Sequence, residues 1–191
     1  MKIKLHHPYK MGLLFAAIYM LAEIILLFMN KNRSQEVTVF SFAFSTLCLL
    51  LGVAISVLVN FNRNKSGGLS MLEDIKAGLK TSAVYALTIA AFITFYYVVL
   101  DPGYTEYRKK EYVERMQDAE ALKELENKMA ENPYYFDGKS KSDIQEMNMD
   151  GVNYILDPMK AFPITLFSLL MLGMVYTFVI MALNRLVLSK L

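Results

Sequence analysis

Residues 79–100 read LKTSAVYALTIAAFITFYYVVL, an apolar run whose only charged side chain, Lys80, stands near its start. A transmembrane helix needs about 20 mainly apolar residues, because each residue adds about 1.5 Å across a hydrocarbon core of about 30 Å. Three further runs meet this requirement, and they span Met11 to Met29, Val37 to Phe61 and Phe162 to Leu186. The sequence therefore predicts an all-α membrane protein with four transmembrane helices.

The composition of the 191-residue chain agrees with this interpretation. Hydrophobic residues make up 55% of the chain, charged residues only 20%, and the net charge is +2. This composition excludes a disordered chain and a strongly basic nucleic-acid-binding protein, so we expect no nucleic-acid partner. The single cysteine, Cys48, falls inside the second run, where a small packing residue is the expected role.

The short loops carry most of their basic residues on one side of the predicted membrane. The N-terminus, the loop before the third run and the C-terminus hold 3, 4 and 2 basic residues, against 2 in the loop after the first run. Positive charge in short loops marks the cytoplasmic side. We therefore expect both termini in the cytoplasm and residues 101–160, with 14 acidic and 9 basic residues, on the outer side.

The first and third runs resemble each other at one offset. Residues 10–21 read KMGLLFAAIYML and residues 76–87 read KAGLKTSAVYAL, with identical Lys, Gly, Leu, Ala, Tyr and Leu positions. The second and fourth runs match more weakly. Because both copies start on the same side, the pattern predicts two helical hairpins related as a parallel repeat. The chain is therefore expected to divide into three segments. They are residues 1–100 with three helices and the basic loop, residues 101–160 with the insert, and residues 161–191 with the fourth helix and the tail.

Small side chains recur at four-residue spacing in these runs. Helices in lipid approach closely where side chains are small, because lipid supplies no hydrophobic drive between them. The hydroxyls among them could instead line a polar pathway, but they can also bond back to their own helix, which favours packing. The helix-packing candidates are Gly12, Ala16, Gly52, Ser56, Ser82, Ala86, Ala90 and Gly173.

Residues 101–160 have the pattern of a small helical insert. Asp101-Pro102 and Asp157-Pro158 are each expected to start a helix. The apolar spacing from Tyr104 to Glu131 predicts one amphipathic helix, and a second is expected to be capped at Ser142 and limited by Gly151. Two short helices bury little apolar surface, so the insert must lean on the bundle, on lipid, on a second copy or on a partner protein. The alternative is a solvated insert with ordinary surface tyrosines. The partner-contact candidates are Tyr104, Tyr107, Tyr112, Met116, Leu122, Leu125, Met129, Tyr134 and Tyr135.

Glu23 is the only carboxylate within the four runs. An intramembrane carboxylate costs a few kcal/mol and is a functional-site candidate by default, although it can also hold helices or a partner together. Tyr19 lies one turn away, and Ser45, Thr94 and Ser168 are expected at comparable depth. The sequence lacks the motifs of nucleophilic catalysis and of metal binding, so we expect no catalytic residue, no metal and no cofactor.

Several short stretches resemble one known family. They read KMGL at residues 10–13, GGLS at 67–70, DIKAGLK at 74–80, YYVVLDPG at 96–103 and SKSDIQEM at 140–147. These patterns resemble the Bacteroidota membrane family called domain of unknown function 4199, which usually has Asn at the position of Asp101. The resemblance implies a small four-helix protein of the bacterial inner membrane with its insert in the periplasm, and it implies no activity.

Two functions are compatible with these features. The first is a non-enzymatic accessory or assembly subunit that binds another envelope protein through the insert and the helix faces. The second is a small oligomeric transporter or proton-coupled carrier that uses Glu23. In both, the lipid bilayer is a partner, and the absence of enzyme motifs favours the first.

Overall fold

The computed structural model describes residues 7–29, 34–64, 71–134, 136 and 138–188. The chain divides into two compact units. The first consists of Met1–Ile93 with Phe162–Leu191, and the second consists of Thr94–Ala161. Every described element is helical.

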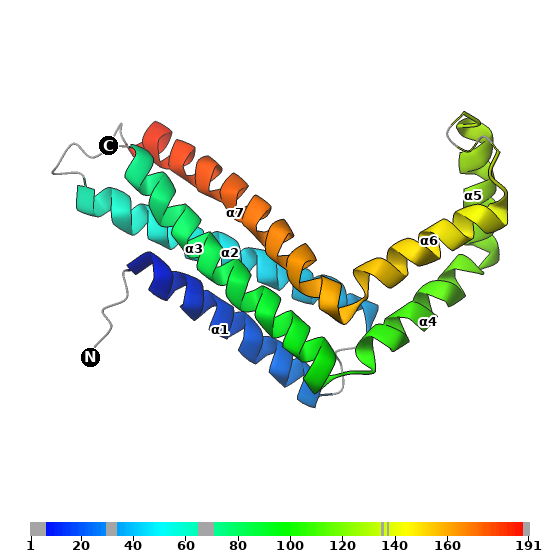
Figure 1. The fold of residues 1–191 in the computed structure, drawn as a ribbon. Helices are drawn as coiled ribbons and strands as arrows, with labels where there is room; N and C mark the ends of the chain where they lie inside the picture. Colours follow the sequence, from blue (N-terminus) through cyan, green and yellow to red (C-terminus); the bar gives the residue numbers. More distant parts are fainter. Residues whose placement is uncertain (1–6, 30–33, 65–70, 135, 137, 189–191) are drawn as a thin grey trace. The chain divides into compact units, whose positions relative to one another are not determined.

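The first unit is a bundle of four long helices (Figure 1). They are α1 (His7–Phe28), α2 (Gln35–Asn64), α3 (Met71–Phe95), which enters the second unit after Ile93, and α7 (Pro158–Leu188), which leaves it at Phe162. All four are long and apolar enough to cross a membrane, which confirms the four predicted runs. These candidate spans are His7–Phe28, Glu36–Asn62, Met71–Leu100 and Pro158–Leu186.

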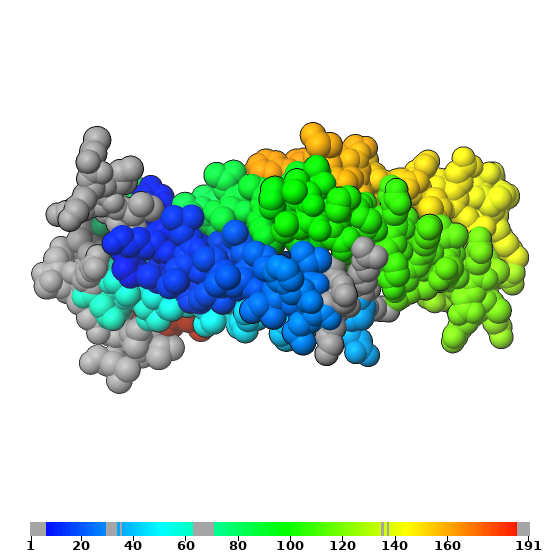
Figure 2. All heavy atoms as spheres, turned by 90° about the horizontal axis from the view of Figure 1, so that it is seen from below, coloured from blue at the N-terminus to red at the C-terminus, as the bar shows by residue number. Residues whose placement is uncertain are grey.

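The bundle has small and medium-sized side chains inside and large apolar side chains outside. Ala16, Val53 and Ala90 are fully buried, whereas Phe28 and Phe42 are 85% and 70% exposed. Water would penalise such exposure, but lipid tails would not, so this distribution fits a bundle surrounded by lipid. Figure 2 shows α1, in dark blue, lying beside α3, in green, along one face of this unit.

Glycines let α3 approach both α1 and α7. A Cβ atom on Gly12 of α1 would lie 2.7 Å from the Thr81 carbonyl oxygen of α3. A Cβ atom on Gly78 of α3 would lie 2.5 Å from the Thr177 methyl carbon of α7, and one on Gly173 of α7 would lie 2.5 Å from the Ser82 Cβ of α3. The predicted helix-packing residues, Gly12, Ala16, Gly52, Ser56, Ser82, Ala86, Ala90 and Gly173, are all buried.

The second unit contains the π-helix η1 (Tyr96–Leu100) and the helices α4 (Tyr104–Met116), α5 (Ala119–Glu131) and α6 (Lys141–Ile155). Helices α4 and α6 lie side by side (Figure 1). Ile144 and Val152 of α6 are buried. In α5, all of whose residues are described, none is buried.

Two details of the insert differ from the prediction: the continuity of the helix from Tyr104 to Glu131, and the helix start at Asp101-Pro102. The predicted single helix is broken, because Asp118 adopts an extended conformation (φ −64°, ψ 141°) and starts α5 as a new helix. Asp101-Pro102 does not start α4, which begins at Tyr104. Instead, the Asp101 N–H donates a 2.8 Å hydrogen bond to the Tyr96 carbonyl and so closes η1. At the other predicted start, the Asp157 carboxylate does cap α7 by accepting a 2.9 Å hydrogen bond from the Met159 N–H.

The cap of α6 is Ser140 and not Ser142. The Ser140 hydroxyl accepts a hydrogen bond from the Asp143 N–H at 3.2 Å, and the Asp143 carboxylate accepts one from the Ser140 N–H at 2.7 Å. These reciprocal bonds satisfy two backbone groups at the helix start, as a capping box does. The prediction that Gly151 limits the helix is also wrong, since α6 continues to Ile155.

Candidate functional site

A buried pair of hydroxyl-bearing side chains links α2 to α3 inside the bundle. The Tyr85 hydroxyl of α3 donates a 2.8 Å hydrogen bond to the Ser45 carbonyl of α2 and lies 3.1 Å from the Ser45 side-chain oxygen. Tyr85 is 1% exposed and Ser45 is buried as well. Tyr85 lies on the packing face of α3, because it follows by one turn Thr81, which contacts α1 and α2.

Glu23 adds a carboxylate to this region. Tyr19 is buried, and the polar groups in the surroundings of its hydroxyl are the Glu23 carboxylate one turn further along α1, the Ser41 hydroxyl of α2 and the Tyr85 hydroxyl of α3. Side chains four residues apart lie on one helix face, which is why the Tyr19 and Glu23 side chains meet. The Ser41 hydroxyl is buried and has no hydrogen bond of standard geometry within the described part of the chain. We call Tyr19, Glu23, Ser41, Ser45 and Tyr85 the tyrosine–glutamate cluster.

The structure brings together only some of the polar residues that the sequence places near Glu23. Tyr19 and Ser45 belong to the tyrosine–glutamate cluster. Ser168 is exposed on the surface of α7, and Thr94 belongs to the second unit. Sequence depth alone selected Ser168, and depth does not give the rotation of a helix about its axis.

A second polar site lies at the end of the bundle where α3 begins and α7 ends. Asp74 is 3% exposed, and its carboxylate accepts hydrogen bonds from the Asn60 amide of α2 at 2.9 Å and from the Arg185 guanidinium of α7 at 3.2 Å. The nearby Asn184 amide nitrogen is buried and has no hydrogen-bond partner among the described residues. The Asp74 carboxylate therefore holds three helices together.

Sequence reasoning missed this ion pair. Asp74 follows the loop between the second and third runs, and Arg185 closes the fourth run. Antiparallel helices bring the start of one helix and the end of its neighbour to the same end of a bundle. An acidic residue near the start of the third run and a basic residue at the end of the fourth could therefore have predicted the pair. The carboxylate is paired, as a buried charge requires.

One hydroxyl joins three helices next to this site. The Thr81 side-chain oxygen of α3 lies 2.7 Å from the Ser56 side-chain oxygen of α2 and 3.0 Å from the Pro8 carbonyl of α1. Ser56 and Thr81 are each 1% exposed. The predicted packing role of Ser56 therefore includes a hydrogen bond between helices, which in apolar surroundings is worth about 1 kcal/mol.

The partner-contact candidates of the insert divide into buried and exposed groups. Tyr104 is buried, because its ring stacks on Tyr97 with a centroid distance of 5.2 Å and contacts Tyr96 edge-on at 6.1 Å. The Arg108 guanidinium lies 5.8 Å from the Tyr104 ring centroid. Tyr107, Tyr112 and Tyr134 are exposed, whereas Met116, Leu122, Leu125 and Met129 are partly exposed, and Tyr135 lies outside the described residues.

Neither site resembles a metal centre. Among the described residues, no three His, Cys, Asp or Glu side chains lie close enough together to hold a metal ion. The tyrosine–glutamate cluster can hold or pass a proton or donate hydrogen bonds to a polar group, because its members are hydroxyls and one carboxyl. The Asp74 carboxylate is already paired with Asn60 and Arg185.

Comparison with known proteins places the chain in a family. The family model described as "Protein of unknown function (DUF4199)" matches residues 10–185. No curated protein and no solved structure matches the chain.

Proposed function

Because the chain belongs to the DUF4199 family, whose description assigns no function, we propose that it is a non-enzymatic accessory or assembly subunit of the bacterial inner membrane. In this proposal the insert binds another envelope protein. The observation that carries it is the exposure of α5, which has an apolar stripe but no buried residue.

The stripe on α5 has the geometry of a contact surface. Leu122, Leu125 and Met129 follow at intervals of three and four residues, which places them on one helix face, and all three remain partly exposed. The opposite face carries Glu120 and Lys123, whose side chains are both exposed. An amphipathic helix gains most of its stability from covering its apolar face, so α5 is expected to be completed by a partner.

Charge indicates the chemistry of that partner. Residues 101–160 contain 14 acidic and 9 basic residues, a net charge of −5. An acidic surface attracts and orients a basic one and is repelled by anionic lipid headgroups. We therefore expect an envelope protein with an apolar patch surrounded by basic residues, and not the lipid surface.

The experiment that tests this proposal compares two double variants of the full-length protein. Leu122→Ser with Leu125→Ser removes the stripe, whereas Glu120→Ser with Lys123→Ser alters the opposite face without changing the net charge. Each tagged chain is expressed in its natural host and purified in mild detergent. The proposal predicts a co-purifying protein with the unaltered chain and the control variant and its loss with the stripe variant. Purification of a single homo-oligomer from all three would contradict it.

The transporter alternative rests on the tyrosine–glutamate cluster. Three helices contribute polar groups to it, and Glu23 is only partly buried. A small proton-coupled carrier would need such a group, since carboxylates inside membranes serve as proton sites. Glu23→Gln, with Glu36→Gln as the control that changes an exposed carboxyl outside the cluster, separates the two functions. The carrier predicts loss of function while partner association is retained.

Orientation and internal symmetry complete the proposal. We infer cytoplasmic termini and a periplasmic insert from the nine basic residues on one side against two on the other. The proposed parallel repeat rests on the matching residues 10–21 and 76–87, since Gly12 lies against α3 whereas its counterpart Gly78 lies against α7. Cysteine labelling in a Cys48→Ser background tests the orientation: a cysteine at Lys123 should react with a membrane-impermeant maleimide applied from the periplasm.

A further inference from the structure

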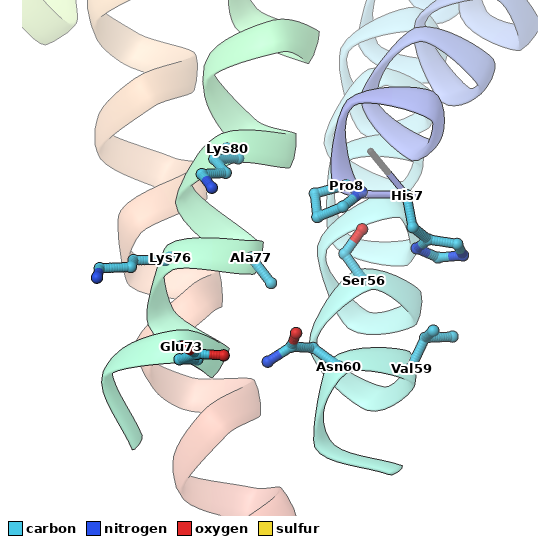
Figure 3. A pocket seen from close by; sticks show the side chains of 9 residues that line it. All are labelled: His7, Pro8, Ser56, Val59, Asn60, Glu73, Lys76, Ala77 and Lys80. Carbon is cyan, nitrogen blue, oxygen red and sulfur yellow. The ribbon is translucent and has the colours of Figure 1, made fainter. Parts of the chain in front are cut away.

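An open cleft lies between α1, α2 and α3 at the end of the bundle that contains Asp74. Its volume is about 320 Å³, which is at the lower end of the range for small-molecule sites. Ser56 and Asn60 of α2 line one side, Glu73, Lys76 and Lys80 of α3 line the other, and His7 of α1 lies at the edge. In Figure 3 the Glu73 side chain is directed toward Asn60 across the cleft, whereas Lys76 points away from α2 at the rim.

The cleft carries both signs of charge on one helix. Glu73, Lys76 and Lys80 are exposed, and within the described part of the chain no salt bridge joins the carboxylate to either lysine. The Lys80 ammonium lies 5.9 Å from the Tyr9 ring centroid. By contrast, the neighbouring Asp74 is already paired with Asn60 and Arg185. Glu73 and the two lysines are therefore available to a ligand that carries an anion and a cation.

These charges stand at the depth of lipid headgroups. The candidate span Met71–Leu100 has 30 residues and would extend about 45 Å, about 15 Å more than the hydrocarbon core. No charged residue occurs in residues 81–100, so those 20 residues fill the core and the excess lies at the start of α3. Lys80 then stands at the edge of the core, Lys76 about 6 Å further out and Glu73 about 10 Å further out.

We propose that this cleft binds a phosphoethanolamine group, with the phosphate at Lys80 and the primary amine at Glu73. In an aminophospholipid the phosphate is next to the acyl chains and the amine is further out. The order of charges along α3, positive near the hydrocarbon core and negative outside it, is complementary to that arrangement. Lysine is suited to the phosphate because its long flexible side chain delivers a compact charge.

Hydrogen bonding makes the site selective among headgroups. A primary ammonium donates three hydrogen bonds, which the Glu73 carboxylate accepts. Phosphatidylcholine has the same charges but no N–H donor, and phosphatidylglycerol would place a neutral polyol at the Glu73 carboxylate. The shared chemistry is a phosphate joined to a primary amine, which a membrane lipid and free phosphoethanolamine both carry. The depth of the charges favours the lipid.

The test uses native mass spectrometry of the full-length protein in detergent with equimolar phosphatidylethanolamine and phosphatidylcholine of identical acyl chains. We expect the singly bound peak to favour phosphatidylethanolamine about fivefold, the ratio that corresponds to about 1 kcal/mol. Glu73→Gln and Lys80→Gln should each bring the ratio close to one. Glu36→Gln and Lys10→Gln, which change exposed charges outside the cleft, should leave it unchanged. Size-exclusion profiles show that each variant is folded.

A second arm distinguishes the source of the ligand. The protein is placed in phosphatidylcholine nanodiscs, and its melting temperature is measured with free phosphoethanolamine. Stabilisation that Glu73→Gln abolishes, without a lipid preference in the first arm, supports the same site with a soluble ligand. Equal binding of both lipids together with no stabilisation, or a ratio unaffected by Glu73→Gln, would overturn the proposal.

Discussion

The contact between α3 and α7 depends on Gly173, and Gly173→Ala tests it. A Cβ atom at this position would lie 2.5 Å from the Ser82 Cβ. Non-bonded carbon atoms pack at about 3.5 to 4.0 Å, so the two helices would have to separate by about 1 Å. Overpacking of this kind costs about 1 to 3 kcal/mol. We expect the free energy of unfolding to fall by that amount.

A second glycine supplies a matched control. Gly151 lies in α6, and a Cβ atom there would meet no atom within 4 Å. Alanine is favoured over glycine in a helix by up to about 1 kcal/mol, so Gly151→Ala should stabilise the protein or leave it unchanged. The same chemical change is therefore expected to have opposite signs at the two positions.

The assay is unfolding of the purified protein in mixed detergent and SDS micelles, followed by far-ultraviolet circular dichroism. A double variant, Gly173→Ala with Ser82→Gly, moves the side chain from one helix to the other and relieves the clash. It should recover stability relative to the sum of its single variants by about 1 to 2 kcal/mol. The reasoning is refuted if Gly173→Ala costs no more than Gly151→Ala, or if the double variant shows no coupling.

Three further predictions follow from the polar contacts. Asp74→Ala should lower the unfolding free energy by about 2 to 4 kcal/mol in the same assay, because it leaves Arg185 without its buried partner; equal stability of variant and unaltered chain would contradict the assigned contact. Tyr85→Phe removes one buried hydroxyl that donates to α2 and should cost about 1 kcal/mol. Hydrogen bonds from the Ser140 side chain and backbone lower the pKa of Asp143 below its usual value. The cap therefore stabilises α6 fully at pH values above the ordinary aspartate pKa. This stabilisation is lost as the pH falls through the lowered pKa of Asp143. The protection of the first α6 amides against hydrogen exchange, measured relative to an unstructured peptide at the same pH, should therefore fall at acidic pH, and Asp143→Asn should abolish most of that pH dependence.

Hydropathy identifies the four spans because length and composition alone determine whether a helix can cross a membrane. The apolar composition of these helices does not indicate which face of each helix points inward. Lipid-facing and buried side chains are both apolar in such a bundle, so the pattern that orients a water-soluble helix is weak. Ser168 shows the consequence: it was selected for its depth, and it lies on the exposed side of α7.

The insert shows a different limit. The apolar spacing from Tyr104 to Glu131 continues across Gln117 and Asp118, so periodicity predicts one helix. Aspartate can stand inside a helix, but it favours the cap position because its side chain bonds to nearby backbone groups. Here Asp118 adopts the extended conformation of a cap and starts α5. Likewise, Ser140 and Ser142 both precede acidic or amide side chains at suitable spacing, and only the geometry of the chain decides between them.

The polar contacts required three-dimensional information for a simple reason. Asp74 meets Arg185 across 111 positions of sequence, and Tyr85 meets Ser45 across 40. Each pairing depends on helix rotation as well as on helix order. Glu23 and Tyr19, by contrast, were predictable because they lie four residues apart on one helix.

Site-specific photocrosslinking on α5 tests the proposed subunit function most directly. A photoreactive amino acid is placed at Leu125 in the apolar stripe or at Glu124 on the exposed face, and living cells of the natural host are irradiated. The docking proposal predicts that Leu125, but not Glu124, crosslinks to one distinct envelope protein with basic residues at its contact site. Crosslinks from Leu125 only to lipid or to a second copy of this chain would contradict it.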